Sequence, residues 1–276
     1  MEIPMQMDDE LQAITQWFAN FDHIAIAVSG GVDSLTLGVL GGRLAGTRCE
    51  MFHARSAAVP SEATRRTREL ARRERWNLHV IDAGEFGDPD YMANPANRCF
   101  HCKTDLYRTI RSQTAMQIVS GTNTDDLGEY RPGLQAAEHF GVRHPYVEAG
   151  IDKAAVRRIA RTLDLDGIAE LPASPCLSSR IETGIPIQTN LLSVVHRVER
   201  IVTNALQCGT VRCRIRAAGV VVELGPDGLS RLSDRNRPQL HAAIAALLQR
   251  EGLEHPVSFE GYRNGSAFLH SHDERT

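Results

Sequence analysis

Short apolar runs rich in β-branched residues alternate with stretches of helical periodicity over the first two-thirds of the chain. This alternation is typical of βαβ units built around a parallel sheet. Five strands are predicted, at residues 23–28, 48–54, 78–81, 117–119 and 142–147. Helices are predicted between and after them at residues 34–44, 61–75, 103–114, 134–140 and 153–163, with Ser61 and Asp152 as N-caps. The pattern therefore predicts an α/β fold with a doubly wound parallel sheet.

The pattern changes near residue 169. Pro172, Pro175, Gly184 and Pro186 interrupt a segment that is too irregular to be one element, which indicates a functional linker. Beyond it we expect a helix at 189–206, strands at 211–216 and 220–224, a helix at 237–249 and a strand at 257–262. The predicted organisation is a first domain over residues 1–168, a linker over 169–188 and a smaller α+β domain for substrate binding and oligomerisation over 189–276, with a frayed tail at 271–276.

A glycine-rich loop follows the first predicted strand directly. It reads Ser29-Gly30-Gly31-Val32-Asp33-Ser34 and precedes a helix. The glycines let the backbone approach an anion, the helix N-terminus supplies N–H groups, and Ser29 and Ser34 add hydroxyl donors. We interpret it as a phosphate-binding loop, against the alternative of a glycine turn that merely joins a strand to a helix. It lacks the lysine of a Walker A loop and the spacing of a dinucleotide-binding loop.

Three cysteines stand in polar or irregular surroundings. Cys99 and Cys102 form a C-x-x-C pair at the expected start of a helix, and Cys176 lies in the linker. A C-x-x-C pair alone is compatible with a redox couple, half a zinc site or part of an iron–sulfur site. Three thiolates suit a [4Fe-4S] cluster with one open iron. The remaining cysteines are expected to pack as small hydrophobes: Cys49, Cys208 and Cys213.

Two arginines of the small domain are expected on one side of a strand. Arg212 and Arg214 alternate along residues 211–216, so their guanidinium groups face the same way and can grip a phosphate. The alternative is a solvated, charged edge strand. Arg180, four residues after Cys176, is a candidate for neutralising phosphate or carboxylate charge, against the alternative of a surface salt bridge.

Polar residues also follow the fourth predicted strand. Asn123, Asp125 and Asp126 stand where ligands of doubly wound sheets gather, although plain turn chemistry would use the same residues. The turn that contains Arg131 could bring its guanidinium to a nucleotide. A basic run within residues 62–75 is interleaved with glutamates and predicts a solvated, ion-paired helix face rather than an RNA-binding surface.

The segment SGGVDS resembles the pyrophosphatase loop of the ATP-pyrophosphatase (PP-loop) superfamily. The resemblance implies that ATP is cleaved between its α- and β-phosphates and that a substrate oxygen becomes adenylylated. Asp33 would be a Mg²⁺-binding or hydrogen-bonding group in the phosphate site. The residues implied in ATP binding are Ser29, Gly30, Gly31, Asp33, Ser34, Gly121, Asn123 and Arg131.

Taken together, SGGVDS, NPANRCFHCK, GTNTDD, EYRPG, SPCLSSRIETG and VRCRI resemble the LarE family of ATP-dependent sulfur transferases over essentially the whole chain. The resemblance implies adenylylation of pyridinium-3,5-biscarboxylic acid mononucleotide and sulfur insertion, a step toward the nickel-pincer nucleotide cofactor of lactate racemase. It also implies that Arg212 and Arg214 hold the substrate phosphate and that Glu223 is a metal or substrate ligand.

The family has two forms that differ in their sulfur source. In one form a single cysteine, matching Cys176, gives up its own sulfur and becomes dehydroalanine. In the other form three cysteines hold a [4Fe-4S] cluster that carries an extra sulfide. Because this chain also contains Cys99 and Cys102, it resembles the cluster form.

Composition and charge narrow the possible location of the protein and the kind of substrate it acts on. The 276 residues carry 31 Lys and Arg against 34 Asp and Glu, a net charge of −3. No apolar run reaches the roughly 18 residues of a membrane span, and the acidic N-terminus is unlike a targeting peptide. We therefore expect a cytoplasmic homo-oligomer that acts on a small nucleotide-like substrate and not on nucleic acid. An iron–sulfur tRNA thiolase would need a basic surface, and a non-catalytic nucleotide-binding protein would release no pyrophosphate.

Overall fold

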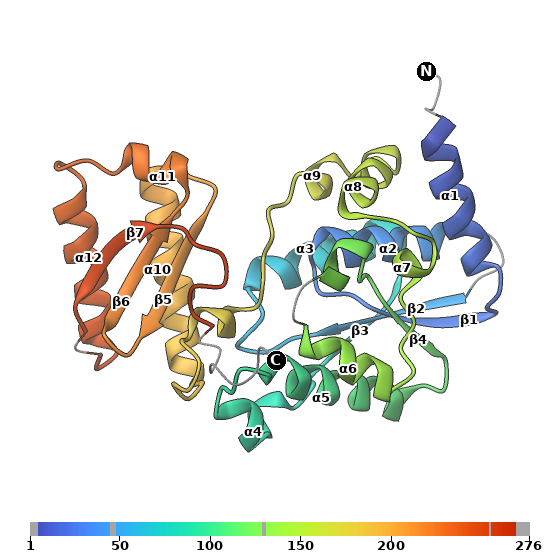
Figure 1. The fold of residues 1–276 in the computed structure, drawn as a ribbon, viewed down its shortest axis with the longest axis horizontal. Coiled ribbons are helices and arrows are strands. Elements are labelled where there is room, and N and C mark those ends of the chain that lie inside the picture. The colour runs from blue at the N-terminus through green and yellow to red at the C-terminus, as the bar shows by residue number, and fades with distance from the viewer. Residues whose placement is uncertain (1–4, 45–47, 129–130, 254, 269–276) are drawn as a thin grey trace. The chain divides into compact units, whose positions relative to one another are not determined.

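The computed structural model describes residues 5–44, 48–128, 131–253 and 255–268 and divides into two compact units (Figure 1). The first unit contains Met1–Glu85 and Cys99–Ser174, and the second contains Phe86–Arg98 and Pro175–Thr276. The tail at 271–276 and residues 129–130 lie outside the described residues. None of the helices in the described ranges is long and apolar enough to cross a membrane.

The first unit is built on a parallel sheet of four strands in the order β3-β2-β1-β4. The strands are β1 (His23–Ala27), β2 (Arg48–Ala54), β3 (Asn77–Ile81) and β4 (Gln117–Ser120), as the sequence predicts to within a residue. The fifth predicted strand, at 142–147, is wrong. Arg143 makes one isolated bridge to Val119, and the helix α7 (Pro145–Glu148) begins two residues later. Pro145 has no N–H for a ladder and suits the first turn of a helix.

Helices cover both faces of this sheet (Figure 1). One apolar cluster packs β1 and β2 against α1, α2, α3, α8 and α9, and a second packs the other face against α5 and α6. The bounds are α1 (Met5–Phe18), α2 (Val32–Arg43), α3 (Ser61–Glu74), α5 (Arg98–Gln113), α6 (Pro132–His139), α8 (Lys153–Thr162) and α9 (Asp166–Ala169). The unit is thus an α/β domain wound on both sides, as the sequence predicts.

The predicted helices of this unit are present with shifted ends. Asp152 caps α8, because its carboxylate accepts the N–H of Ala155 at 2.7 Å. Ser61 is instead the first residue of α3, and Pro60 occupies the N-cap. The helix α5 begins five residues before the predicted start at 103, so the C-x-x-C pair is helical. The sequence pattern missed α1.

The second unit is a mixed sheet backed by helices. In the order β5-β6-β7, β5 (Val211–Arg216) and β6 (Gly219–Leu224) are antiparallel, and β7 (Val257–Gly261) runs parallel to β6. The long helices α10 (Thr189–Leu206) and α12 (Arg237–Arg250) pack on it and on each other. Shorter pieces are η1 (Glu85–Gly87), α4 (Pro89–Met92), η3 (Leu177–Arg180) and α11 (Pro226–Arg231), while η2 (Thr124–Gly128) belongs to the first unit.

The segment 86–98 belongs to the second unit, although the sequence pattern assigns it to the first domain. Asn94, which is fully buried, holds it there. Its side-chain amide donates to the carbonyls of Glu182 and Ile185 at 2.8 and 2.9 Å. The N–H of Ile187 also donates to the carbonyl of Met92. These long-range hydrogen bonds leave no periodic signal in the sequence.

Candidate functional site

The glycine-rich loop between β1 and α2 is closed by its own two serines. The hydroxyl of Ser34 accepts the backbone N–H of Ser29 and lies 3.0 Å from the Ser29 hydroxyl. It can also donate to the carbonyl of Gly31, the N-cap of α2, at 3.2 Å. The first N–H groups of α2 have no acceptor within the helix and face the N-terminal side. The loop is therefore a closed turn at a helix N-terminus, a geometry that suits an anion.

Glycine is required at Gly30 by both conformation and space. Its φ is +88°, and a Cβ there would stand 2.8 Å from the carbonyl oxygen of Ala63 on α3. The helix α3 also holds the loop from the side, because Arg66 Nε donates to the carbonyl of Gly30 at 3.1 Å. The loop conformation thus depends on α3 as well as on β1 and α2.

Gly121 brings the end of β4 against the same loop. A Cβ at this position would lie 2.8 Å from the backbone N of Ser34 and 2.9 Å from the carbonyl carbon of Asp33. β1 lies between β2 and β4, and the strand order reverses there, because β2 and β3 follow on one side of β1 and β4 lies on the other. Because it has no side chain, Gly121 lets the backbone after β4 pack directly against the backbone of Asp33 and Ser34.

Asp33 is the centre of a polar network on the loop. Its Oδ1 accepts from Asn123 Nδ2 at 3.3 Å, and its Oδ2 lies 2.5 Å from Lys153 Nζ. The hydroxyl of Tyr146 donates to its backbone carbonyl at 3.2 Å. Asn123 is 1% exposed, whereas the Lys153 side chain keeps 32% of its surface exposed. Sequence reasoning missed Lys153, although its position as the first residue after the Asp152 cap is a usable signal.

The polar residues after β4 combine turn chemistry with the site. The Asn123 side chain accepts the N–H of Asp125, and Asp126 accepts the N–H of Asn123. Asp126 also pairs with Arg131 at 2.7 Å, and the Arg131 side chain is 44% exposed. The Asp125 carboxylate accepts the N–H of Lys153 at 3.3 Å. These contacts confirm the turn interpretation and show that the turn positions Asn123 and Lys153, and the ligand role of these residues stays a prediction.

His53 is a buried support of the loop that sequence reasoning missed. The imidazole is completely buried, with Nδ1 2.8 Å from the carbonyl of Val28 and Nε2 2.9 Å from the hydroxyl of Thr64. Burial lowers the pKa of His53 below its usual value. In the neutral form one nitrogen donates to Val28 and the other accepts from Thr64, which ties the strand before the loop to α3.

The six cysteines make no disulfide. Cys99 and Cys102, both partly buried, lie three residues apart in the first turns of α5 and thus on one helix face. Cys176 is partly buried as the N-cap of η3 in the second unit. Burial raises the pKa of Cys49 to about 12, and it also raises the pKa values of Cys208 and Cys213. These raised pKa values agree with the prediction that Cys49, Cys208 and Cys213 pack as small hydrophobic residues.

Arg180 fixes the backbone of the segment that contains Cys176. Its guanidinium donates to the carbonyls of Pro175 and Cys176 at 2.7 and 3.0 Å, and it pairs with Glu199 at 2.9 Å. The side chain is 3% exposed. Ser179 donates to the same Cys176 carbonyl through both its hydroxyl and its N–H. Arg180 therefore forms a largely buried ion pair instead of the surface salt bridge of the alternative interpretation, and it fixes the backbone at Cys176. Its predicted role in neutralising ligand charge stays a prediction.

The arginines of β5 lie close to this segment. Arg214 pairs with the fully buried Glu223 at 2.9 Å and donates to the carbonyl of Ser179 at 3.1 Å. Arg212 donates to the carbonyl of the preceding residue, Val211, and its guanidinium lies over the ring of Tyr262. Burial lowers the pKa of Arg212, and the nearby charge of Arg180 lowers it further. The structure thus gathers the three predicted arginines into one cationic cluster.

Glu223 orders this cluster. Its two oxygens accept from Arg214, Arg216 and the hydroxyl of Ser266. A carboxylate with these three partners balances part of the positive charge and fixes the guanidinium of Arg214. The geometry accordingly gives Glu223 a positioning role, and its predicted role as a metal or substrate ligand stays a prediction.

The predicted site residues fall into two groups, one in each unit. The first unit brings together the phosphate-type loop, Gly121 and Asn123, with Arg131 joined through Asp126. The second unit brings together the Cys176 segment and the three arginines. Sequence and structure thus define a two-unit α/β protein with a glycine-rich loop at the carboxyl edge of its parallel sheet.

Comparisons with known proteins agree with this class. No protein-family model matches the chain. It is 33% identical over 232 residues to the uncharacterized protein slr1717 of Synechocystis, covering 82% of this chain and 85% of that protein. The chain therefore belongs to the same family as this cyanobacterial protein. It is also 29% identical over 213 residues to the uncharacterized protein MJ0830 of Methanocaldococcus jannaschii, covering 76% and 80% of the two chains.

A more distant relative has a named activity. The pyridinium-3,5-bisthiocarboxylic acid mononucleotide synthase of Lactiplantibacillus plantarum is 25% identical over 214 residues. The match covers 74% of this chain and 75% of that enzyme. The similarity extends beyond one motif, because it spans most of both proteins.

Proposed function

We propose that the protein is an ATP-dependent sulfur transferase that thiolates a carboxylate of pyridinium-3,5-biscarboxylic acid mononucleotide. The similarity to the synthase from Lactiplantibacillus plantarum supports the substrate class. The observation that carries the proposal is the loop at residues 29–34, where two serine hydroxyls meet at the N-terminus of α2 and Lys153 pairs with Asp33 of the same loop. This arrangement suits the phosphates of ATP, and the superfamily resemblance assigns the loop to pyrophosphate release.

The proposed reaction has two steps. A carboxylate oxygen of the substrate attacks the α-phosphorus of ATP, the bond to the bridging oxygen breaks, and pyrophosphate leaves with that electron pair. A sulfide then attacks the adenylylated carbonyl carbon and AMP leaves, which gives the thiocarboxylate. The loop N–H groups and Lys153 stabilise negative charge on the leaving pyrophosphate. Asp33 orients Lys153 and offers carboxylate oxygens that suit Mg²⁺.

The second unit supplies groups suited to the substrate. Arg212 and Arg214 lie two positions apart on β5, and Arg212, the less buried of the two, can bind the nucleotide phosphate, while Arg214 adds positive charge from beneath the surface. Glu223 fixes Arg214, and Arg180 fixes the backbone at Cys176. Sulfur transfer would then use Cys176, whose segment is held in one conformation.

The three cysteines outside the apolar core fit a [4Fe-4S] cluster by their chemistry. Thiolates are the usual ligands of iron–sulfur clusters, and the C-x-x-C pair on α5 places two of them on one face. Cys99, Cys102 and Cys176 would hold it. Such a cluster, with three protein ligands, would supply an iron with an open position that can carry the sulfide.

The decisive experiment measures pyrophosphate and AMP release from ATP with and without the pyridinium dicarboxylate mononucleotide, under anaerobic conditions. We expect release that depends on this substrate and a product heavier by the difference between sulfur and oxygen. Asp33→Ala should abolish pyrophosphate release in a folded protein. ATP binding without any release would instead indicate a nucleotide-binding protein and contradict the proposal.

Iron and sulfide analysis of the anaerobic protein tests the sulfur source separately. Each single Cys→Ala change among the three cluster cysteines should remove iron and sulfur transfer but leave pyrophosphate release. Iron-free protein that loses the mass of hydrogen sulfide at Cys176 after one turnover would contradict the cluster and leave the sulfur transferase proposal standing.

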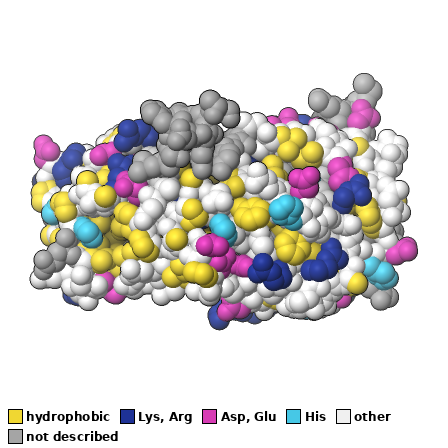
Figure 2. Space-filling model, turned by 60° about the horizontal axis from the view of Figure 1, so that its bottom comes forward, with side chains coloured by type: hydrophobic (Ala, Val, Ile, Leu, Met, Phe, Trp, Pro, Cys, Tyr) yellow, Lys and Arg dark blue, Asp and Glu magenta, His cyan; other side chains and the backbone are white. Residues whose placement is uncertain are grey.

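The alternative of a tRNA thiolase has less support. The chain carries a net charge of −3, whereas RNA binding relies on many phosphate contacts from Lys and Arg. On the face shown in Figure 2, basic and acidic side chains are interspersed and the basic ones form no continuous stripe. A small phosphorylated substrate fits this surface better.

A further inference from the structure

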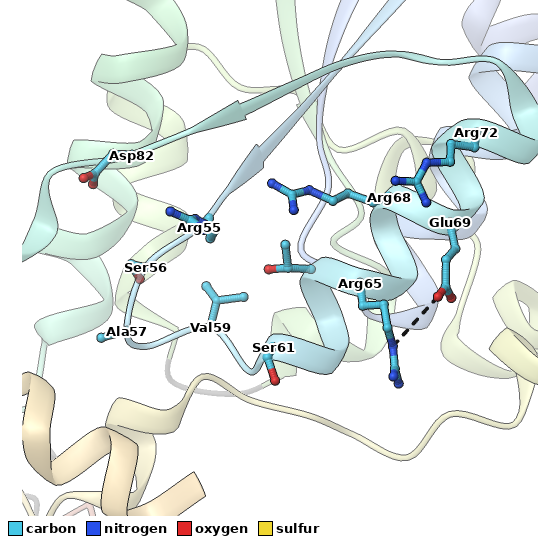
Figure 3. Close-up of a pocket in the computed structure, with 11 residues that line it drawn as sticks. Arg55, Ser56, Ala57, Val59, Ser61, Arg65, Arg68, Glu69, Arg72 and Asp82 are labelled. Atoms are coloured by element: carbon cyan, nitrogen blue, oxygen red, sulfur yellow. Dashed lines mark ion pairs between the residues drawn. The ribbon is translucent and has the colours of Figure 1, made fainter.

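A pocket lined by arginines lies in the first unit (Figure 3). Its volume is about 750 Å³, and none of the residues 29–34 lines it. Its walls come from the segment after β2, from α3 and from the end of β3. The residues that give it its chemistry are Arg55, Ser56, Arg65, Arg68, Arg72 and Asp82.

The charges in this pocket are not balanced by the protein. Four guanidinium groups face two carboxylates, Glu69 and Asp82. Arg65 lies 3.9 Å from Glu69, and Asp82 accepts the backbone N–H of Gly84. Within the described ranges, the guanidinium groups of the other three pocket arginines make no hydrogen bond and no ion pair: Arg55, Arg68 and Arg72.

The ion-paired face predicted for residues 62–75 is confirmed for part of α3, where Arg65 lies near Glu69 and Arg73 pairs with Glu74. Among the described residues, Arg68 and Arg72 form no such pair. Glu74 is used by Arg73 and, from α2, by Arg43, and neither arginine lines the pocket. Arg68 and Arg72 stand one turn apart on α3, a spacing at which like charges destabilise a helix. Figure 3 shows Arg68 reaching from α3 toward Arg55 on the opposite wall. Like charges that converge on a hollow are stabilised by an anion between them.

We propose that this pocket binds a small phosphorylated molecule carrying two or more negative charges, at a site separate from the glycine-rich loop at residues 29–34. The planar guanidinium fork matches phosphate oxygens in pairs, and the hydroxyls of Ser56 and Ser61 add donors at the rim. The volume is in the range of small-molecule sites and far exceeds that of a single phosphate ion.

The lining also argues against nucleic acid as the ligand. Among the residues that the structure describes, no aromatic side chain lines the pocket. Proteins that bind single-stranded nucleic acid stack bases on aromatic rings and follow the backbone along an extended groove. A single hollow with arginines on facing walls instead suits one compact anion.

The test is calorimetric titration of the full chain with 2,3-bisphosphoglycerate at low ionic strength. We expect binding to the wild type that Arg68→Gln and Arg72→Gln each weaken by about tenfold or more, because each removes charge-assisted hydrogen bonds. Arg55→Gln, on a different element, should have the same effect. Arg73→Gln is the matched control, since it removes the same charge from the same helix outside the pocket.

Each of the following results would contradict the proposal. No binding to the folded wild type would remove the site. An equal loss in Arg73→Gln would reduce it to general electrostatic attraction. A loss in Lys153→Met with normal binding in the pocket variants would place the anion at the phosphate-type loop. Displacement of the probe by a short RNA hairpin at lower concentration than by inorganic pyrophosphate would indicate nucleic acid. Circular dichroism of Arg55→Gln and Arg68→Gln, whose changes lie on separate elements, confirms folding.

Discussion

Lys153 Nζ lies 2.5 Å from Oδ2 of Asp33, so the first residue of α8 is paired with the first turn of α2. The two residues are 120 positions apart in the chain. Asn123 and Tyr146 bind the same aspartate through its other carboxylate oxygen and its carbonyl. The loop therefore carries a lysine beside its anion site, supplied from a distant helix.

The first prediction concerns this lysine. Lys153→Met should lower substrate-dependent pyrophosphate release by about a hundredfold or more, the usual effect of removing one group that stabilises a leaving anion. The same helix offers a control in Arg161→Met, because Arg161 pairs with Glu170 on the exposed side. Release by Lys153→Met at the rate of Arg161→Met would show that the lysine only braces Asp33.

Gly121 provides a test of loop packing. Gly121→Ala places a methyl group 2.8 Å from the backbone N of Ser34, where only the backbone can yield. We expect a loss of about 1–3 kcal/mol in the free energy of unfolding and weaker ATP binding by calorimetry. Gly167→Ala, on α9 with open space around the new Cβ, should keep both. Normal ATP affinity in Gly121→Ala would mean that the loop position is not set by β4.

The strands of the first unit were predictable because each is a short apolar run between turn residues. The exception at 142–147 has the same apolar content, and Pro145 decided against it by starting α7. A short apolar run therefore predicted a strand correctly wherever each residue had a backbone N–H to donate to a neighbouring strand.

The site was predictable only where it is local in sequence. The loop at 29–34 and the alternation of Arg212 and Arg214 are local patterns, and the structure bears out their placement. Lys153 and His53 act through contacts across the sheet edge, which no spacing along the chain encodes. The partners of Arg214 and Arg180 come from other elements, β6 and α10, so the sequence did not reveal that the buried Glu223 and the partly buried Glu199 hold them.

Arg180 provides a prediction about the Cys176 segment. Arg180→Lys keeps the charge but cannot donate at once to Glu199 and to the carbonyls of Pro175 and Cys176. We expect a destabilisation of about 1–3 kcal/mol and faster alkylation of Cys176, measured by peptide mass mapping. The control is Arg197→Lys, which alters an exposed pair with Glu251. Unchanged alkylation in a folded Arg180→Lys protein would show that Cys176 is held by Ser179 alone.

His53 predicts how stability depends on pH. Its pKa in the folded protein lies below the value of about 6.5 in the unfolded chain, because burial disfavours the imidazolium. As the pH falls below about 6.5, the unfolded state takes up a proton before the folded state does, so stability decreases until the folded pKa is reached. Urea unfolding midpoints of the wild type should therefore fall between pH 7 and pH 5.

The variant His53→Gln isolates this contribution. Glutamine can still donate to the carbonyl of Val28 or accept from Thr64, but it has no proton to gain. The fall in midpoint between pH 7 and pH 5 should become shallower, although His144, whose pKa is also lowered by burial, leaves part of it. His23→Gln changes an exposed ring on β1 and serves as the control. Equal slopes in wild type and His53→Gln would mean that His53 takes up its proton at the same pH in the folded and the unfolded protein, and the hydrogen bond from Thr64 to its Nε2 would then be wrongly assigned.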